Sequence, residues 1–287
     1  MSPYVNLEFN LELGDVTLHG VERGAGKRVI FLHGFPEHSY SWRHQMGPVA
    51  EAGFRAIAPD LRGYNLSSRP KGLRAYAADK VAADIVTLIE RTGEGPVTLV
   101  GHDWGGVIAY QVAMQAPEKL ERLILLNAPH LVSYKRALRR PDQFKKSWYA
   151  YLFQLPFVPE RYTRANDFAV LRRVFQNATV TPNAVSAEDV ETYINAFRPR
   201  GALTAAMNYY RAMLWMRSPK LCRIDVPTTV IYGVEDKFLN AEVVVPDARW
   251  VSNLTVHRVE KAGHFIQYDR PAQVNRLLLD ILRSPPP

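Results

Sequence analysis

The stretch LVGHDWGGVIAYQ, residues 99–111, decides the fold. Its apolar start is typical of a buried strand, and the apolar spacing after Asp103 is that of a helix. Glycines flank the turn on both sides, which allows a strand and a helix to cross closely there. We therefore expect a strand over 97–101 and a helix over 104–116, with the Asp103 carboxylate at the tip of the turn.

The rest of the chain alternates strand-like and helix-like segments. Continuous apolar runs closed by turn residues are typical of strands buried on both faces, whereas apolar residues three and four apart indicate helices. The strand-like segments are an early hairpin over 4–11 and 15–22, then 28–34, 54–60, 120–127, 228–233 and 254–260. Further helix-like segments lie over 41–53, where Ser41 would cap the start, over 76–93 and over 275–283. This order predicts an α/β protein with a mostly parallel, doubly wound sheet.

The alternation stops between residues 130 and 218, where helix-like spacing continues without a strand-like run. That range holds fourteen Lys and Arg against six Asp and Glu, a net charge of +8, which equals the net charge of the whole chain. We expect a core domain made of residues 1–129 and 219–287, with 130–218 inserted as a helical lid. The cations are spread among apolar helix positions, which favours solvated helix faces over nucleic-acid binding.

Several function classes are disfavoured by composition. No run of 18 apolar residues is present, so we expect no membrane span and no membrane partner. The N-terminal residues have no signal-peptide pattern, and the single cysteine, Cys222, cannot pair within the chain, so we expect a cytoplasmic protein. No spacing indicates a metal site or an organic cofactor. The sequence leaves monomer and homodimer open.

Three chemically capable residues follow three of the expected strands. Asp103, Asp236 and His264 come after 97–101, 228–233 and 254–260, and reactive groups collect at the carboxyl ends of parallel strands. Each residue alone has an ordinary structural interpretation: Asp103 as a helix N-cap, Asp236 as a turn residue and His264 as a core histidine. Together they follow the order nucleophile, acid, histidine, which favours a catalytic triad on a hydrolase fold. Asn127, at the end of another strand, cannot hold a charge, and the ring of His102 is expected to pack under the turn.

A second motif, HGFPEHSYSWRHQ over residues 33–45, supplies the other half of such a site. The main-chain N–H groups of Phe35 and Trp104 are placed to form an oxyanion hole. A carboxylate nucleophile suits displacement at a saturated carbon and leaves an ester of Asp103. His264 would activate water against that ester, and Asp236 would orient the imidazole. The sequence therefore predicts hydrolysis of a carbon–heteroatom bond at an sp3 carbon.

The motifs HGFPE, DLRGYNLSSRP, GHDWGG, YGVEDKF and AGHFIQYDRP resemble those of the α/β-hydrolase-fold epoxide hydrolases, which are related to the haloalkane dehalogenases. The resemblance implies a small apolar epoxide as substrate, water as the second reactant, and two lid tyrosines that protonate the leaving oxygen. By the surrounding pattern these are Tyr149 and Tyr210, with Tyr151 and Tyr209 as neighbouring alternatives. Phe35 and Trp104 would contact the substrate together with the two tyrosines.

Two other functions stay open at this point. A haloalkane dehalogenase would cradle halide with Trp104 and a lid tryptophan, Trp148 or Trp215, although Phe35 offers no side-chain donor. A non-catalytic binding protein on the same fold is the second alternative. Apolar lid residues indicate an apolar pocket; they are Phe153, Leu155, Phe157, Met207 and Met213.

Overall fold

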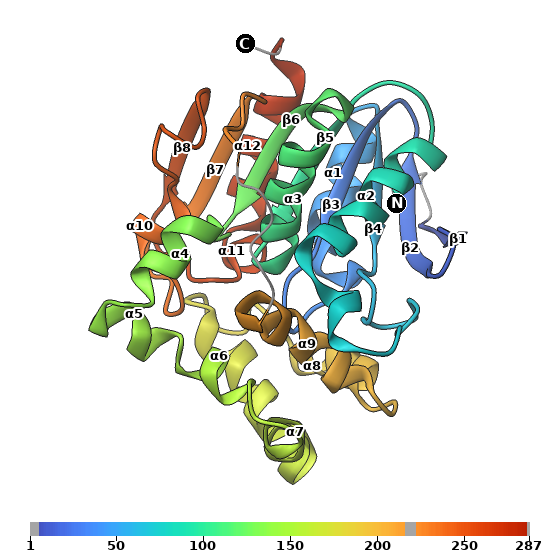
Figure 1. Ribbon diagram of the computed structural model, residues 1–287. Helices are drawn as coiled ribbons and strands as arrows, with labels where there is room; N and C mark the ends of the chain where they lie inside the picture. The colour runs from blue at the N-terminus through green and yellow to red at the C-terminus, as the bar shows by residue number, and fades with distance from the viewer. Residues whose placement is uncertain (1–5, 216–221, 286–287) are drawn as a thin grey trace.

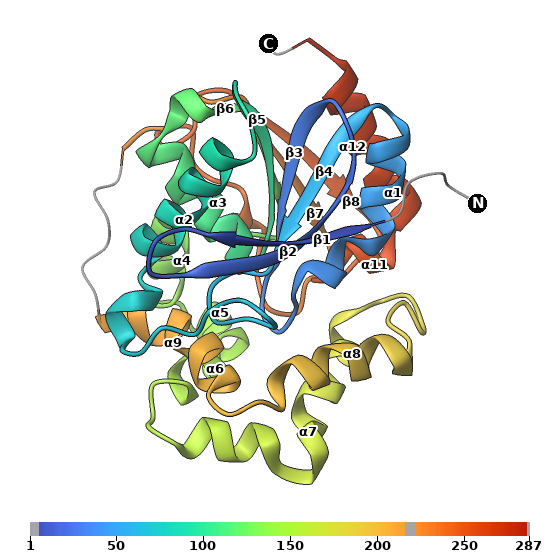
Figure 2. The same cartoon turned by 90° about the vertical axis from the view of Figure 1, so that its right-hand side faces the viewer.

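The computed structural model describes residues 6–215 and 222–285, and its centre is an eight-stranded sheet (Figures 1 and 2). The strand order is β1-β2-β4-β3-β5-β6-β7-β8. β1 and β2 pair antiparallel, as do β2 and β4, and all other neighbours run parallel. The strands are β1 (Leu7–Glu12), β2 (Thr17–Gly24), β3 (Lys27–Leu32), β4 (Phe54–Pro59), β5 (Val97–His102), β6 (Leu120–Leu126), β7 (Thr228–Gly233) and β8 (Leu254–Val259).

Helices cover both faces of the sheet, which explains the continuous apolar runs of the central strands. In β3, Ile30 and Leu32 pack into one apolar cluster, with α2 (Ala78–Arg91) and α3 (Trp104–Gln115). Val29 and Phe31 alternate with them and pack into the opposite cluster, with α1 (Arg43–Glu51) and α12 (Pro271–Arg283). Because side chains alternate across a strand, both sets must be apolar. The predicted α/β-hydrolase architecture of a doubly wound, mostly parallel sheet is confirmed.

The residues described between β6 and β7 form helices and no strand. These helices are α4 (Leu131–Ala137), α5 (Pro141–Lys146), α6 (Trp148–Leu152), α7 (Val158–Ala178), α8 (Ala187–Phe197) and α9 (Ala202–Trp215). Most of them gather in a layer below the sheet, which is most evident in Figure 2. α7 is interrupted at residues 165–168, where three successive residues have positive φ. We propose that 130–218 act as a lid, although residues 216–218 lie outside the described part of the chain.

Some local expectations differ from the structure. Ser41 does not cap α1, because it belongs to a 3₁₀ turn, Ser39–Trp42, whose backbone leads directly into the helix. Gly53 does follow the end of α1 with φ +90, as a C-terminal glycine should. Cys222, the single cysteine, is free and exposed. The two strands of the first hairpin end one and two residues later than expected, and residues 4 and 5 of that expectation lie outside the described part of the chain.

Candidate active site

Asp103 occupies the tight turn between β5 and α3, with φ 50° and ψ −119°. A non-glycine residue in this region is strained, and such strain persists only where the surrounding structure enforces it. Close packing provides that enforcement: a Cβ on Gly105 would lie 2.1 Å from the carbonyl oxygen of Leu32, and one on Gly106 would lie 2.1 Å from the Cβ of Ala128. The turn therefore presents the Asp103 carboxylate at the carboxyl edge of the sheet.

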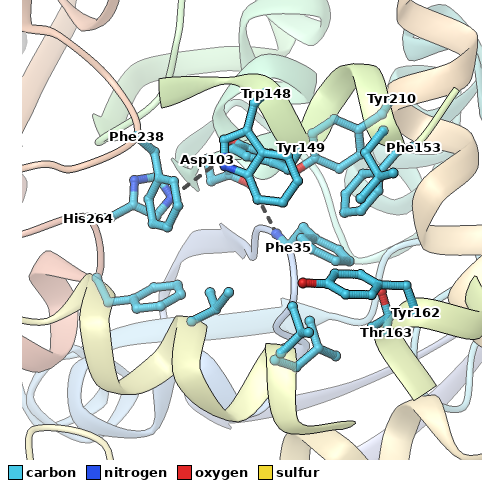
Figure 3. Close-up of a pocket in the computed structure, with 15 residues that line it drawn as sticks. Phe35, Asp103, Trp148, Tyr149, Phe153, Tyr162, Thr163, Tyr210, Phe238 and His264 are labelled. Carbon is cyan, nitrogen blue, oxygen red and sulfur yellow. Dashed lines mark hydrogen bonds and ion pairs between the residues drawn. The ribbon is translucent and has the colours of Figure 1, made fainter. Parts of the chain in front are cut away.

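The Asp103 carboxylate contacts one group on each oxygen. The N–H of Phe35 donates to Oδ1 at 3.0 Å, and Nε2 of His264 lies 3.6 Å from Oδ2 (Figure 3). The turn after β3 thus brings one of the two expected oxyanion donors to the Asp103 carboxylate. Among the described residues, no hydrogen bond joins the N–H of Trp104 to this carboxylate.

His264 lies between two carboxylates. Its Nδ1 is 2.9 Å from Oδ2 of Asp236, so the three residues expected at strand ends meet in one chain of contacts. Burial alone would lower the pKa of His264, but Asp236 and Asp103 together raise it to about 10. Burial alone would raise the pKa of Asp236, whereas the charge of His264 and several hydrogen bonds hold it below its usual value.

Asn127 fixes Asp236 from the neighbouring strand. Its Nδ2 donates to Oδ2 of Asp236 at 2.7 Å, and its Oδ1 accepts from the N–H of Gly233 at 3.0 Å. The other oxygen, Oδ1 of Asp236, accepts from the N–H groups of Phe238 and Leu239. Sequence reasoning weighed Asn127 only as a replacement for the acid and missed its contact with Asp236. The contact could have been expected because Asn127 follows β6 and Asp236 follows the neighbouring strand β7.

Tyr149 and Tyr210 face Asp103 from the lid. Their ring centroids are 5.9 Å apart, and that of Tyr210 lies 5.0 Å from that of Trp104 and 5.6 Å from that of Phe35. Burial is the main cause that raises the pKa of both phenols well above the usual value, so both are neutral donors at ordinary pH. The structure thus brings all of the sequence-predicted site residues to one place.

The neighbouring tyrosines lie elsewhere. The hydroxyl of Tyr209 donates to the carbonyl of Arg62 at 2.8 Å, and Tyr151 is exposed, with its ring against Phe144. Another phenol, that of Tyr134, is buried near Asp103, and burial raises its pKa to about 12. Sequence reasoning missed Tyr134 because α4 gives no pattern that separates it from an ordinary packed tyrosine.

Two cavities meet at Asp103, Tyr149 and Tyr210. The larger, about 710 Å³, is otherwise lined mainly by aromatic and aliphatic residues, with His264 at one end (Figure 3). The smaller, about 330 Å³, lies beside Trp104 and reaches Tyr134 and Met213. Of the apolar lid residues expected to line a pocket, Phe153 lines the larger cavity and Met213 the smaller.

The other three apolar lid residues lie away from both cavities. Met207 is buried in the core, and Leu155 and Phe157 are exposed, so the expectation that these three line a pocket was wrong. Trp148, an alternative donor for halide, lines the larger cavity. The side chain of Trp215, the other alternative, lies outside what the structure describes.

A buried pair supports His264 from below. Nδ1 of His102 is 2.8 Å from Oε2 of Glu37, and its Nε2 is 2.9 Å from the main-chain oxygen of His264. Both ring nitrogens therefore have a hydrogen-bond partner, and Nε2 of Gln267 also lies 3.4 Å from Nδ1. Burial alone would raise the pKa of Glu37, but His102 and the hydroxyl of Tyr268 hold it below its usual value. His102 packs under the turn, as expected from the sequence, and Glu37 was missed.

Comparison with known proteins agrees with this geometry. A family model described as alpha/beta hydrolase fold matches residues 27–271. An AB hydrolase superfamily protein, YfhM of Bacillus subtilis, is 39% identical and the match covers 94% of this chain and 95% of that protein. Epoxide hydrolase 3 of Xenopus tropicalis is 35% identical over 89% of this chain and 71% of its own length. The crystal structure of Bacillus megaterium epoxide hydrolase with an inhibitor superposes with a TM-score of 0.88 at 33% identity, covering 96% of this chain and all of the other.

The chain belongs to the epoxide hydrolases of the α/β-hydrolase fold. The resemblance inferred from the motifs is thereby confirmed. Among residues 6–215 and 222–285, no group of three or more metal-binding side chains comes together, and no helix is long and apolar enough to cross a membrane.

The contacts of Asn127 generate a prediction about stability. Asn127→Gly keeps the left-handed backbone, φ 42°, but removes the side-chain hydrogen bonds with Asp236, Gly233 and Gly263. We expect the free energy of unfolding to fall by about 1–3 kcal/mol, because a buried carboxylate and a buried N–H lose partners. Denaturant titration measures it. Asn183→Gly is the matched control, since Asn183 has φ 57° and is exposed; an equal loss there would contradict the assignment.

Proposed function

We propose that this protein hydrolyses apolar epoxides to vicinal diols through a covalent ester on Asp103. The observation that carries the proposal is the environment of that carboxylate, between the N–H of Phe35, the imidazole of His264 and two neutral phenols. Epoxide hydrolases of Xenopus tropicalis and Bacillus megaterium among the relatives support the reaction class. The proposal includes the roles expected for Asp103, Asp236 and His264.

In the first step the Asp103 carboxylate attacks one ring carbon from behind, and the C–O bond to the epoxide oxygen breaks. Charge develops on that oxygen, which takes a proton from Tyr149 or Tyr210. Both tyrosines border the two cavities at the same point as Asp103, which suits an epoxide held between them and the nucleophile. A phenol serves here because it is neutral before the step and recovers its proton from solvent afterwards.

In the second step water attacks the ester carbonyl carbon of Asp103. His264 takes the proton of that water, Asp236 stabilises the resulting cation, and the N–H groups of Phe35 and Trp104 receive the developing oxyanion. The tetrahedral intermediate then collapses: the bond between the ester carbon and the alkyl oxygen breaks, and His264 returns its proton to that oxygen. The diol leaves, and the carboxyl group of Asp103 loses its proton to solvent. Ester formation removes the negative charge of Asp103, which is one of the causes of the raised pKa of His264. The chemistry of the first step therefore prepares the histidine to act as a base in the second.

The cavities indicate the kind of substrate. Both are walled by apolar side chains, and the larger is about twice the volume of the smaller. An epoxide at the junction places one substituent in each cavity. We therefore propose an epoxide with a large substituent, of aryl or long alkyl type, on one carbon, and hydrogen or a small group on the other.

The covalent step is tested by trapping the ester. His264→Gln removes the base of the second step, so incubation with styrene oxide is expected to add the mass of one substrate molecule to the protein. Intact-protein mass spectrometry followed by peptide mapping should place the adduct on Asp103. Asp103→Asn in the same background is the control and should show no adduct. An unmodified His264→Gln protein would contradict the ester.

The tyrosine roles are tested with conservative variants. Tyr149→Phe and Tyr210→Phe should each slow ring opening by about 10²–10⁴-fold, because each removes a proton donor. The matched control is Tyr209→Phe, which lies next to Tyr210 but bonds to Arg62, and its ring-opening rate should not change. Single-turnover fluorescence with styrene oxide gives the rate of this step.

The same variants separate epoxide hydrolysis from the dehalogenase alternative. Wild-type protein should release diol from the epoxide and no bromide from 1-bromobutane. Bromide release that both tyrosine variants retain would favour the dehalogenase, and no turnover together with no trapped ester would favour a binding protein. The larger cavity contains the indole of Trp148, but Phe35 supplies no side-chain donor, so epoxide hydrolysis is the better supported function.

The raised pKa of His264 predicts that hydrolysis of the ester depends on pH. His264 acts as a base only when neutral, so hydrolysis of the ester should accelerate as pH rises. Because the ester of Asp103 is uncharged, the midpoint should lie below about 10, the pKa of His264 in the free protein. Decay of the ester in single-turnover experiments across this range measures the midpoint. A rate that falls with rising pH would contradict the role of His264.

A further inference from the structure

Exposed apolar side chains are concentrated on one edge of the lid. Among the described residues, eleven large apolar side chains are exposed, and seven of them lie in α5, α6, the connection between α6 and α7, and the start of α7. We call these seven the lid stripe; they are Phe144, Trp148, Tyr151, Leu155, Phe157, Val158 and Tyr162. Single exposed apolar residues are common, but a contiguous group of this size marks an interaction surface.

The lid stripe is continuous with the larger cavity. The rings of Phe144 and Tyr151 are 4.9 Å apart, and Trp148 and Tyr151 in α6, like Val158 and Tyr162 in α7, are three or four residues apart within one helix. Trp148 and Tyr162 belong to the stripe and also line the cavity (Figure 3). The apolar surface therefore runs from the outer edge of the lid to the entrance of the site.

Phe157 is the most exposed member of the stripe. Its side chain is 84% accessible, and its backbone has φ 62°, in the left-handed region that bulky residues rarely adopt. Both the exposed ring and the strained backbone cost free energy, and no burial within this chain offsets the exposed ring. A ring held outward in this way is suited to insertion into another apolar phase.

Cations flank the stripe without matching anions. Arg139, Lys145 and Arg161 are exposed and form no ion pair with any described residue. The two acids of this region are already paired, Asp142 with Arg140 and Glu160 with Arg211. The lid range 130–218 also carries the whole net charge of the chain, +8. The segment that carries the exposed apolar side chains therefore also carries exposed cations that form no ion pair with the described residues.

We propose that the lid stripe docks on an anionic lipid surface, with Phe157 and Trp148 among its anchors and the flanking cations on the headgroups. Exposed aromatic side chains beside Lys and Arg are the features by which proteins lie on membranes without crossing them. A second copy of this chain is a poorer occupant, because its own cations would face these. The proposal revises the expectation of no membrane partner, which rested on the absence of a spanning segment. If the proposed function holds, an apolar epoxide dissolved in the lipid reaches the site directly.

Vesicle sedimentation tests the proposal without relying on catalysis. Full-length protein is mixed with sucrose-loaded vesicles of phosphatidylcholine alone, or with about a third of phosphatidylserine. We expect sedimentation with the phosphatidylserine vesicles, loss of binding at high salt, and little binding to neutral vesicles. Epoxide turnover without vesicles is measured separately, so failure of docking and failure of the proposed function are distinguishable.

Two sets of variants separate docking from general charge or folding effects. Arg139→Glu, Lys145→Glu and Arg161→Glu combined should lower the partition coefficient at least about tenfold, and Phe157→Ser should also lower it. The controls are Arg283→Glu, at the end of α12, and Leu7→Ser, on β1, which change exposed residues away from the lid. Turnover of a water-soluble epoxide should be the same in all of these, because none of the changed residues lines a cavity.

Three results would overturn the proposal. The first is no sedimentation with phosphatidylserine vesicles. The second is equal loss of binding in the Arg283→Glu control. The third is a concentration-dependent dimer in analytical ultracentrifugation that Phe157→Ser abolishes while vesicle binding is absent, which would assign the stripe to a second copy of the chain.

Discussion

The site depends on the position of the His264 imidazole between two buried carboxylates. Removing three ionisable groups from water is costly, and it is tolerated only where each charge has a partner at short distance. Asp103, Asp236 and His264 are each nine-tenths or more buried, and each comes from a different loop. The parallel arrangement of β5, β6, β7 and β8 places these loops side by side at the same edge of the sheet. The fold therefore brings the imidazole within reach of both carboxylates.

Below this triad lies a second buried pair, Glu37 and His102. Glu37 and His102 are fully enclosed, and the carboxylate also accepts hydrogen bonds from Gln267 and Tyr268. Because His102 reaches the main-chain oxygen of His264, the pair fixes the loop that carries the imidazole. It also extends through Tyr268 to Tyr193 in α8, so the lid and the loop of His264 share one hydrogen-bonded network.

The sequence was most informative where the packing of a segment in the fold directly determines its local residue pattern. Continuous apolar runs could be assigned to central strands because both faces of the sheet are covered, and the glycines around Asp103 could be interpreted because the turn leaves no space for a Cβ. It was less informative on the lid. Tyr209 and Tyr210 are adjacent and equally apolar in context, yet a helix turns by about 100° per residue, so only one can face Asp103. Their separation needed the resemblance to a known family. For Leu155 and Phe157, apolar character indicated burial in a pocket, whereas both face outward.

The exposed apolar residues account for the high apolar content of α6 and its neighbouring segments. α6 directs Tyr149 toward the site and Tyr151 toward solvent, so this short helix is apolar on more than one side. A helix that is apolar all round is ordinarily buried in a core or in lipid. Here one side faces the cavity, and on the other side Tyr151 contacts Phe144 and both rings stay exposed. The net positive charge of the chain is carried by the same range, 130–218. These features serve one purpose if the lid both shapes the cavity and brings its entrance to an anionic apolar phase.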